Sequence, residues 1–282
     1  MTSFNDLGLA APILQALAAE GYTAPTPIQA QAIPQILAGR DMLGIAQTGT
    51  GKTAAFALPI LHKLAERKQS APRRGCRALV LSPTRELASQ IAKSFRTYGA
   101  RLNLNIAVVY GGVSPGPQIK ALSAGVDILV ATPGRLVDHM DSNVTRLLGA
   151  EFLVLDEIDQ MLDLGFIKPI RKIVGTLPAK RQNLFFSATM PVEIRRLADE
   201  FLNEPATVSV APVSTTAERI QHQIVFVEAA RKRSLLVELF DDDAMKRAIV
   251  FTRTKRGADK VAQHLENAGI PTSAIHGNKS QG

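Results

Sequence analysis

Short apolar runs that alternate with longer helical patterns limit the folds open to this chain. Most of these runs are apolar throughout, as strands buried on both faces of a parallel sheet are. The stretches between them, such as Glu86–Tyr98, carry apolar residues with the period of a helix. We predict strands at Met42–Ala46, Arg77–Ser82, Ile106–Tyr110, Ile128–Ala131, Phe152–Asp156 and Asn183–Ser187. This rhythm predicts an α/β fold in which helices flank a parallel sheet.

A break near residue 210 divides the chain into two predicted domains. Thr207–Val210 is predicted to be the last strand of the first domain, residues 1–210. Residues 211–218 mix Pro212 with serine and threonine and have no apolar period, which predicts a linker. The rhythm then restarts over residues 219–282, a stretch in which a lone core would be marginal. There we predict strands at Gln223–Val227, Ala248–Thr252 and Thr272–Ile275 and helices at Lys232–Phe240 and Gly257–Ala268.

The composition is that of a soluble globular protein with a basic balance. Apolar residues make up 46% and charged residues 21% of the 282 residues, and the net charge is +8. This charge favours a polyanionic partner such as nucleic acid, although plain solubility also explains it. Cys76 is the only cysteine, so no internal disulfide is possible and a reducing compartment is expected. No apolar run approaches the roughly 20 residues that cross a bilayer. We therefore expect a cytoplasmic protein without a membrane segment.

A glycine-rich loop follows the first predicted strand and opens a helix. Its residues are Gln47, Thr48, Gly49, Thr50, Gly51, Lys52 and Thr53. Such a loop turns backbone N–H groups toward phosphate oxygens, while its lysine reaches the β and γ phosphates and its last hydroxyl faces Mg²⁺. Ala46 stands where the strict pattern has glycine, but a small residue still permits the turn. The alternative is a simple turn with a solvated lysine. The loop predicts a nucleoside triphosphate site without naming the reaction.

Two carboxylates end another predicted strand. The apolar run Phe152–Leu155 leads directly into Asp156 and Glu157. Ligands of open parallel sheets lie beyond the carboxyl ends of the strands, where the phosphate loop also lies. Asp156 is therefore predicted to coordinate Mg²⁺, and Glu157 to orient and deprotonate an attacking water. A solvated acidic pair is the alternative, and a solvated helix face is the preferred interpretation of Asp163.

These motifs resemble those of the DEAD-box RNA helicases, in particular the RhlE-like bacterial branch, over essentially the whole chain. The resemblance implies a RecA-like domain that binds ATP with Mg²⁺, followed by an incomplete second RecA-like domain. Gly21-Tyr22 and Pro25-Thr26-Pro27-Ile28-Gln29 match the adenine-recognising motif of the family, with Phe4 as the upstream aromatic that stacks on the base. An amide that donates and accepts at once lets Gln29 select adenine over guanine. Taken alone, Gln29 would be an ordinary surface residue.

Three further motifs match the RNA-contacting segments of the family. They comprise Pro83, Thr84 and Arg85, then Gly111 and Gly112, and finally Thr132, Pro133, Gly134 and Arg135. Each motif follows a predicted strand, so all can emerge along one edge of the sheet. Arginines, hydroxyls and helix N-termini hold phosphates and 2′-hydroxyls, which reads the RNA backbone with little sequence specificity. Arg135 alone would be an ordinary surface arginine.

A last motif of the first domain, Ser187-Ala188-Thr189, resembles the segment that couples ATP state to RNA grip. Its hydroxyls are expected to bond Asp159 at the end of the acidic motif. Position 158 is isoleucine where the family has alanine, and its bulk is expected to cost about 1–3 kcal/mol in packing or coupling if the pocket is tight.

Past the linker, Thr252 and Arg253 belong to a segment that resembles the first RNA-binding motif of the family's second domain. Residues 276–281 resemble the motif that follows it. The later family motifs, with the arginines that complete the ATP site, are absent from this sequence. We therefore expect a truncated, monomeric ATP-dependent RNA helicase core with impaired RNA-stimulated ATPase activity. Its partners would be RNA and RNA-processing or ribosome-assembly proteins.

Two other functions remain open. One is a nucleotide- and RNA-binding module with little ATP turnover, because half of the catalytic cleft is missing. The other is a small-molecule kinase or a different phosphate-loop enzyme, which would leave Gln29 and Arg135 unexplained. The five histidines show no metal-ligand spacing and are predicted to be structural or surface residues.

Overall fold

The computed structural model describes residues 3–67, 69–210, 223–240, 245 and 247–279. The chain divides into two compact units, Met1–Ser214 and Thr215–Gly282, which are treated separately below. The predicted linker, residues 211–218, lies outside the described residues, so it stays a prediction. No helix in the described part of the chain has both the length and the apolar character to span a membrane.

The first unit is built on one seven-stranded sheet in which every pairing is parallel. Its order is β3-β4-β2-β5-β6-β1-β7, so the strands that follow one another in the chain are often not neighbours. The strands are β1 (Met42–Ile45), β2 (Cys76–Leu81), β3 (Ile106–Val109), β4 (Val126–Ala131), β5 (Phe152–Leu155), β6 (Gln182–Ser187) and β7 (Ala206–Ser209). The prediction of a helix-flanked parallel α/β sheet is confirmed.

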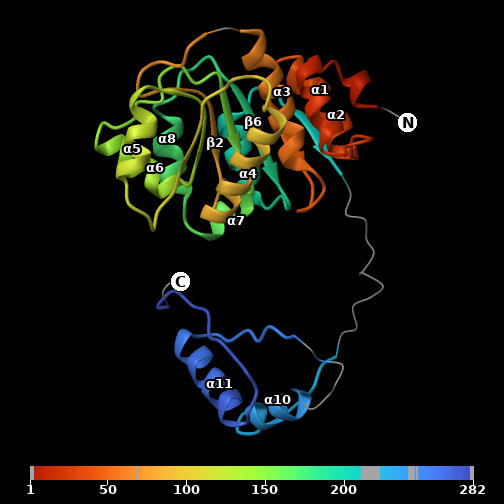
Figure 1. The fold of residues 1–282 in the computed structure, drawn as a ribbon, viewed down its shortest axis with the longest axis vertical. Coiled ribbons are helices and arrows are strands. Elements are labelled where there is room, and N and C mark those ends of the chain that lie inside the picture. The colour runs from red at the N-terminus through yellow and green to blue at the C-terminus, as the bar shows by residue number, and fades with distance from the viewer. Residues whose placement is uncertain (1–2, 68, 211–222, 241–244, 246, 280–282) are drawn as a thin grey trace. The chain divides into compact units, whose positions relative to one another are not determined.

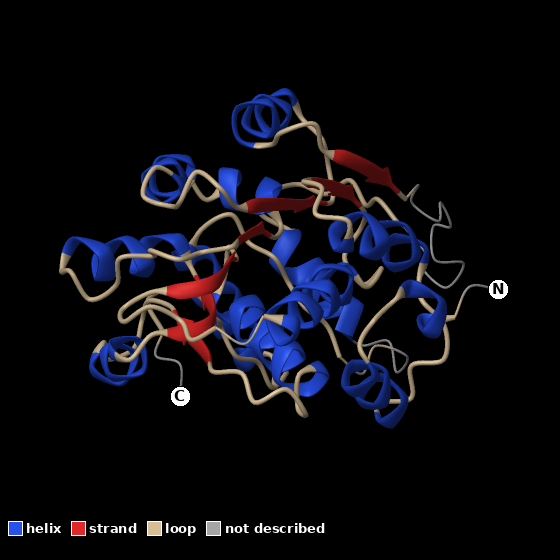
Figure 2. Ribbon diagram, turned by 90° about the horizontal axis from the view of Figure 1, so that it is seen from above, coloured by secondary structure: helices blue, strands red, loops and turns tan. Residues whose placement is uncertain are grey.

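Helices cover both faces of this sheet (Figures 1 and 2). One face carries the short 3₁₀ helix η1 (Phe4–Leu7) and helices α1 (Ala11–Ala19), α2 (Pro27–Leu37), α3 (Lys52–Glu66) and α4 (Arg85–Tyr98). The other carries α5 (Gly116–Ser123), α6 (Pro133–Asp141), α7 (Ile158–Asp163), α8 (Ile167–Val174) and α9 (Val192–Phe201). Alternate residues along each strand feed the two cores, because successive strand side chains point to opposite faces.

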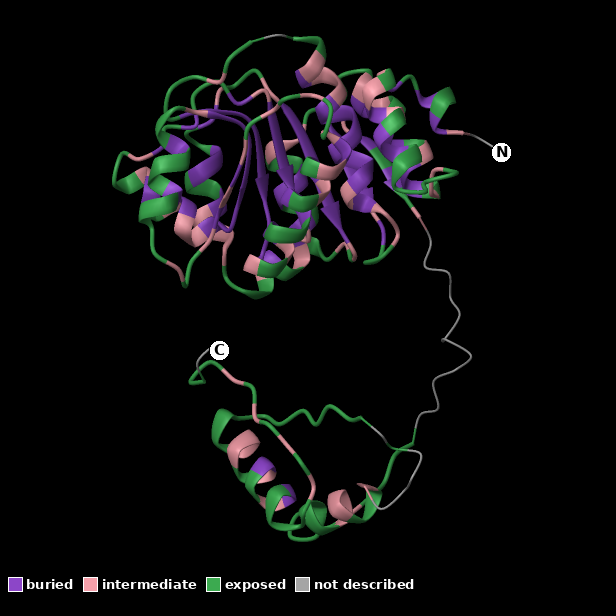
Figure 3. Cartoon of the chain, viewed as in Figure 1, coloured by how far each residue is buried: buried purple, intermediate pink, exposed green. Residues whose placement is uncertain are grey.

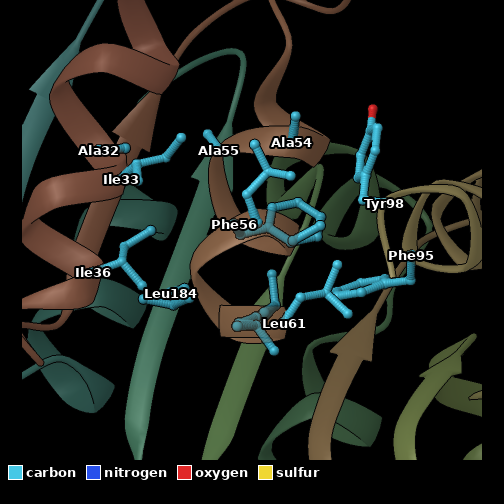
Figure 4. Close-up of a cluster of buried hydrophobic side chains, with 14 of the residues drawn as sticks. Ala32, Ile33, Ile36, Ala54, Ala55, Phe56, Leu61, Phe95, Tyr98 and Leu184 are labelled. Atoms are coloured by element: carbon cyan, nitrogen blue, oxygen red, sulfur yellow. The ribbon is translucent and has the colours of Figure 1, made fainter. Parts of the chain in front are cut away.

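The core on the α1–α4 face is centred on Phe56 of α3. Its ring packs against Phe95 of α4 and Phe186 of β6, at centroid separations of 6.1 and 5.4 Å. Figure 4 shows Phe56 between helix α2 and the side chain of Phe95. The central strands are buried almost throughout (Figure 3), which explains their unbroken apolar sequences. Cys76, the only cysteine, is fully buried at the start of β2.

The second unit contains the two predicted helices, as α10 (Lys232–Phe240) and α11 (Lys255–Asn267). The three strands predicted at Gln223–Val227, Ala248–Thr252 and Thr272–Ile275 are wrong, because no strand is formed in the described residues of this unit. Their apolar side chains are instead exposed, Phe226 at 96% and Phe251 at 91%. A strand exists only with a hydrogen-bonded neighbour, and these segments have none here.

Candidate functional site

The phosphate loop connects β1 to α3 at the carboxyl edge of the sheet. Gly49 and Gly51 adopt φ angles of 85° and 93°, a left-handed conformation that favours glycine. Between them, the Thr50 hydroxyl donates to the carbonyl oxygen of Gln47 at 2.6 Å and closes the turn. Helix α3 then begins at Lys52, so its unpaired N-terminal N–H groups face the loop. Thr48 and Thr53 complete this segment, with Thr53 in the first turn of the helix.

Lys52 is the residue of this loop that points most directly to an anionic ligand. Its side chain is only 6% exposed, and its ammonium group has no hydrogen-bond partner among the described residues. A buried charge without a partner is costly, so such a group is normally met by an opposite charge. The loop therefore has the form of an anion site, with a cation and a helix N-terminus together.

The acidic pair lies at the end of β5, at the same edge. Asp156 is buried, and its Oδ1 accepts a hydrogen bond from the backbone N–H of Glu157 at 3.0 Å. Burial raises the pKa of Asp156 to about 6, and the charge of Glu157 adds to the rise, while the charge of Lys52 opposes it. The lysine of the loop thus lies near enough to act electrostatically on this carboxylate.

Glu157 holds an unusual backbone conformation. Its φ and ψ angles are 52° and 54°, in the left-handed region that costs a residue with a side chain roughly 1–2 kcal/mol. Backbone strain of this kind gathers at functional sites, where the surrounding structure enforces it. The Glu157 carboxylate also accepts a hydrogen bond from the Thr48 hydroxyl at 3.4 Å. This contact joins the acidic pair to the phosphate loop, although strand β6 lies between β5 and β1.

The residues present fit a magnesium ion. Magnesium commonly takes one or two carboxylates together with phosphate oxygens and water. Asp156 supplies a carboxylate, and Thr53 supplies a hydroxyl beside the loop. No group of three or more His, Cys, Asp or Glu side chains in the described residues forms a metal cluster by itself. The donor set is therefore suited to a metal that arrives with a phosphate ligand.

Gln29 lies beneath the phosphate loop and is 2% exposed. Its side-chain carbonyl accepts a hydrogen bond from the N–H of Thr26, and its amide donates to the carbonyl oxygen of Gly51 at 3.1 Å. A Cβ built on Gly51 would come within 2.3 Å of that amide nitrogen. A side chain at residue 51 would be strained by the φ of 93° and would displace the Gln29 amide, which directly supports the loop conformation.

Phe4, the predicted adenine-stacking aromatic, lies beside Tyr22 of the adenine-recognising motif on the α1–α4 face. Phe4 is 5% exposed, and its ring meets Tyr22 edge-on at 6.3 Å. Tyr22 is partly exposed, and its hydroxyl shares a hydrogen bond with that of Tyr98. The stacking role of Phe4 and the ATP-binding role of Tyr22 stay predictions.

The three predicted RNA motifs follow β2, β3 and β4, which are neighbours at one end of the sheet. Thr84 caps helix α4, since its hydroxyl accepts a hydrogen bond from the Leu87 N–H. Thr132 is the N-cap residue of α6, and Pro133 and Gly134 form its first turn. Pro83 precedes Thr84 in the loop after β2.

Side chains tie these motifs to one another. The guanidinium of Arg85 lies 5.0 Å above the ring of Tyr110, the residue before Gly111. Arg135 donates to the carbonyl oxygen of Val113, just after Gly112, whose φ is 78°. Each of the other two motifs therefore contacts the glycine turn after β3 through an arginine. The prediction that the three motifs emerge along one edge of the sheet is confirmed.

Asp159 receives the hydrogen bonds predicted for the segment after β6, with one exception. Its Oδ2 accepts from the N–H groups of Ala188 and Thr189 and from the Thr189 hydroxyl, at 3.0–3.1 Å. The hydroxyl of Ser187 does not take part: it is buried without a partner in the described structure. The expectation was wrong for Ser187. Strand alternation turns its side chain toward the α5–α9 face, which also carries Asp159, but Ala188 and Thr189 supply all three donors to Asp159 Oδ2. Ile158 is fully buried in the core on this face.

The order of the strands sorts the motifs into two groups. Along the sheet edge, the predicted RNA motifs follow β3, β4 and β2. The predicted acidic motif follows β5, the predicted coupling segment follows β6 and the phosphate loop follows β1. Thr252 and Arg253 belong to the second unit, where the Thr252 hydroxyl bonds the carbonyl oxygen of Thr254. Both are exposed.

A polar hollow of about 450 Å³ lies at the opposite edge, before β1 and β6. Its buried carboxylate, Asp41, accepts hydrogen bonds from the backbone and side chain of Asn183 and from the Asn203 N–H. These donors satisfy the carboxylate, so its role is to fasten β6 and the α9–β7 loop to β1. The hollow is separate from the motifs described above.

Sequence reasoning missed three features of the site. They are the link between Thr48 and Glu157, the support of Gly51 by Gln29, and the unpartnered hydroxyl of Ser82. The first two depend on contacts between distant segments, and only a sheet order could have suggested them. The third carried a signal in the sequence, because Ser82 ends an otherwise apolar strand pattern.

Comparison with known proteins agrees with this geometry. The sequence pattern of the DEAD/DEAH box helicases matches residues 26–197, which is more than half of the chain. The DEAD-box ATP-dependent RNA helicase CshA of Geobacillus kaustophilus is 42% identical over 281 residues, covering 100% of this chain and 59% of its own length. The DEAD-box ATP-dependent RNA helicase 20 of Arabidopsis thaliana is 43% identical, over 99% of this chain and 56% of its own.

The fold has a solved counterpart. The crystal structure of a DEAD box protein from the hyperthermophile Methanococcus jannaschii matches with a TM-score of 0.69 and 36% identity, over 100% of this chain and 74% of that one. The chain spans little more than half the length of the curated relatives. With its RecA-like sheet and the matched motifs in order along one edge, the chain belongs to the DEAD/DEAH box helicase family.

Proposed function

We propose that this chain binds ATP with Mg²⁺ and the RNA backbone, as part of an ATP-dependent RNA helicase that remodels short RNA duplexes. The observation that carries the proposal is the buried, unpartnered ammonium of Lys52 beside the carboxylate of Asp156. A cation and a carboxylate at the end of a glycine-rich loop suit a triphosphate and its metal. The relatives from Geobacillus kaustophilus and Arabidopsis thaliana are ATP-dependent RNA helicases, which supports the same activity.

Each residue of the ATP half has a distinct task in this proposal. The loop from Gln47 to Gly51 cradles phosphate oxygens with backbone N–H groups, and Lys52 neutralises the β and γ phosphates. Asp156 and Thr53 hold the metal, in part through water. When bound, Mg²⁺ would offset the negative charge of the phosphates. Glu157 positions a water on the γ phosphate and takes its proton.

Recognition of the base and of RNA would use the other motifs. Gln29 reads adenine with its amide, and the pair Phe4 and Tyr22 supplies an aromatic surface. Arg85 and Arg135 hold RNA phosphates, while Gly111, Gly112 and the helix N-termini at Thr84 and Thr132 approach the backbone closely. Thr252 and Arg253 add RNA contacts from the second unit. Coupling between the two ligands runs through Asp159 and Thr189, with Ser187 in the core beside them.

A second function is favoured by the state of the second unit. Its three extended segments form no sheet in the described structure and expose Phe226 and Phe251. A chain whose second unit forms no sheet would bind nucleotide and RNA but turn over little ATP. In phosphoryl transfer, an arginine supplied to the ATP site from a second domain contributes roughly 10³–10⁵ in rate, and this contribution would be missing.

One experiment tests the proposal and separates the two functions. ATP binding and RNA-stimulated ATP hydrolysis are measured on the same preparation of this chain, with and without Mg²⁺. Binding of Mg²⁺·ATP with hydrolysis at helicase-like rates supports the helicase, and binding with little turnover supports the binding module. The absence of any Mg²⁺·ATP binding would refute both.

Four further expectations are part of this proposal. Membership of the RhlE-like branch, a monomeric state, a cytoplasmic location and RNA-processing or ribosome-assembly partners all stay predictions.

A further inference from the structure

Ser82 carries a hydroxyl that the folded chain does not use. The residue is fully buried at the end of β2, and its Oγ has no hydrogen-bond partner among the described residues. Buried polar groups are nearly always hydrogen-bonded, because leaving one unpaired destabilises the fold. Alanine would fill this position without leaving such a group behind. The hydroxyl therefore needs an explanation beyond packing.

The register of the sheet places Ser82 beside the acidic pair. Leu81 pairs with Leu155 of β5, and its carbonyl oxygen accepts a hydrogen bond from the Asp156 N–H. Ser82 follows Leu81 as Asp156 follows Leu155, so the two residues are lateral neighbours on adjacent strands. On the other side of β2, Leu81 pairs with Ala131, and the Ser82 N–H donates to the carbonyl oxygen of Ala131.

The side chains of Ser82 and Asp156 also point to the same face of the sheet. Val80 and Val154 belong to the core on the α1–α4 face, and Leu81 and Leu155 belong to the opposite core. Because strand side chains alternate, residue 82 is turned toward the same face as Asp156. That is the face covered by α3, whose first residue is Lys52.

Ser187 provides the contrast. Its hydroxyl is likewise buried without a partner. However, Ser187 is the last residue of β6 and points to the same face as Phe185, which belongs to the core on the α5–α9 face. Among the described residues, the unpartnered groups on the α3 face at this edge are thus the Ser82 hydroxyl, the Lys52 ammonium and the Thr26 hydroxyl, which lies beside Gly51 of the loop. The first two lie next to the Asp156 carboxylate.

We propose that Ser82 is a positioning residue for magnesium-bound ATP, whose hydroxyl accepts a hydrogen bond from a water of the metal's hydration shell at Asp156. Adjacent strands lie about 4.8 Å apart, a separation that one water spans between two side chains. A water bound to a cation is a strong donor, so a free hydroxyl acceptor at this place would order the shell. The inference rests on the proposed function.

The test compares ATP binding by the 282-residue chain in Mg²⁺ and in a metal chelator, for the wild type and Ser82→Ala. We expect Ser82→Ala to weaken the affinity for ATP in Mg²⁺ by about threefold to tenfold, the effect of one hydrogen bond. The affinity in chelator should stay within about twofold. Resistance of the ligand-free chain to urea should be equal or greater, since no hydrogen bond of the free protein is lost.

Two further variants separate the hydroxyl from its volume. Ser82→Cys keeps the size but replaces the oxygen with a poor acceptor, so it should lose affinity in Mg²⁺ as Ser82→Ala does. Ser123→Ala, an exposed serine at the end of α5 on the opposite edge, should bind as the wild type does.

The outcomes are distinct. Wild-type affinity of Ser82→Ala in Mg²⁺, or an equal loss with and without the metal, overturns this inference and leaves the proposed function intact. Loss in Ser82→Ala but not in Ser82→Cys shows that packing is responsible, which also overturns it. A wild-type chain that fails to bind ATP in Mg²⁺ refutes the proposed function itself.

Discussion

The hydroxyl of Thr48 donates to the carboxylate of Glu157 across 3.4 Å, although 109 residues separate them in the sequence. One partner lies in the phosphate loop, and the other is the residue proposed to activate water. The contact is long for a hydrogen bond between an alcohol and a carboxylate, so a ligand between the two groups can replace it at little cost. Glu157 is thus held near the loop before any nucleotide binds.

Glu157→Gln should separate binding from turnover. The glutamine keeps an acceptor for Thr48 and the backbone conformation, so nucleotide affinity should change by less than about threefold, the effect of a weak hydrogen bond. It cannot take a proton, so hydrolysis should fall by about 10²–10⁴. Binding is measured on this chain, and turnover on a protein with a complete second RecA-like domain. Hydrolysis at the unmodified rate would remove Glu157 from the mechanism.

Lys52→Ala should lose triphosphate affinity without losing stability. Removing the ammonium should weaken ATP binding by about tenfold to a hundredfold, because its bonds to phosphate are charge-assisted. The ammonium of Lys52 makes no hydrogen bond in the described residues. Its removal should therefore not lower the free energy of unfolding, measured without nucleotide, by the amount that the loss of a buried hydrogen bond would. Lys63→Ala, later on the same helix, serves as the control in titration and urea unfolding. Undiminished affinity would contradict the assignment.

Asp156 should make the stability of the nucleotide-free protein depend on pH. Burial raises its pKa from 3.8 to about 6. Between these values the folded state keeps a proton that the unfolded state releases, so the free energy of unfolding falls as the pH rises from about 4 to 6. Asp156→Asn should remove this slope and gain up to about 3 kcal/mol at neutral pH. Urea unfolding across this range, without divalent cations, measures it.

The matched control for that measurement is Asp163→Asn, on the exposed end of α7. It should retain the wild-type slope. A slope that persists in Asp156→Asn would assign the pH dependence to other groups.

Gln29→Ala should affect more than the choice of base. If the amide only reads adenine, the variant loses affinity for ATP, gains relative affinity for GTP and binds inorganic tripolyphosphate as before. Because the amide also bonds the Gly51 carbonyl oxygen, we expect weaker tripolyphosphate binding too, by about threefold to tenfold. Competition assays with the three ligands measure both effects. Unchanged tripolyphosphate binding would show that the loop does not depend on Gln29.

Arg135→Ala should weaken RNA binding almost equally for all sequences. Loss of one phosphate contact is expected to lower the slope of log affinity against log salt by about 1. The variant also frees the carbonyl oxygen of Val113, so the turn at Gly111 and Gly112 should loosen. Arg146→Ala, an exposed arginine on the opposite edge, is the control. A change of sequence preference would argue for base contacts instead.

The sequence was sufficient for the first unit because its local and long-range signals agree. Each predicted strand in that unit is present within one or two residues of its predicted ends, and the short apolar runs could only be buried between two helical layers. The loop and the acidic pair were predictable for the same reason, since both follow strands at a shared edge.

The second unit shows where such reasoning fails. Helices α10 and α11 close their own hydrogen bonds, so local sequence is enough to place them. The segments Gln223–Val227 and Ala248–Thr252 have strand-like sequences, but a strand needs a neighbour at the right register. The apolar pattern of a segment does not indicate whether a neighbouring strand is present to pair with it.

The lateral order of the strands has a consequence for how such a protein can diversify. Loops after β3 and β4 lie away from those after β6 and β1, with only β2 and β5 meeting at the boundary. Because loops on a rigid sheet tolerate change independently, substitutions at the outer turns would, under the proposed function, alter which polynucleotides are held while the triphosphate site is preserved. One scaffold can in this way give rise to many specialised descendants.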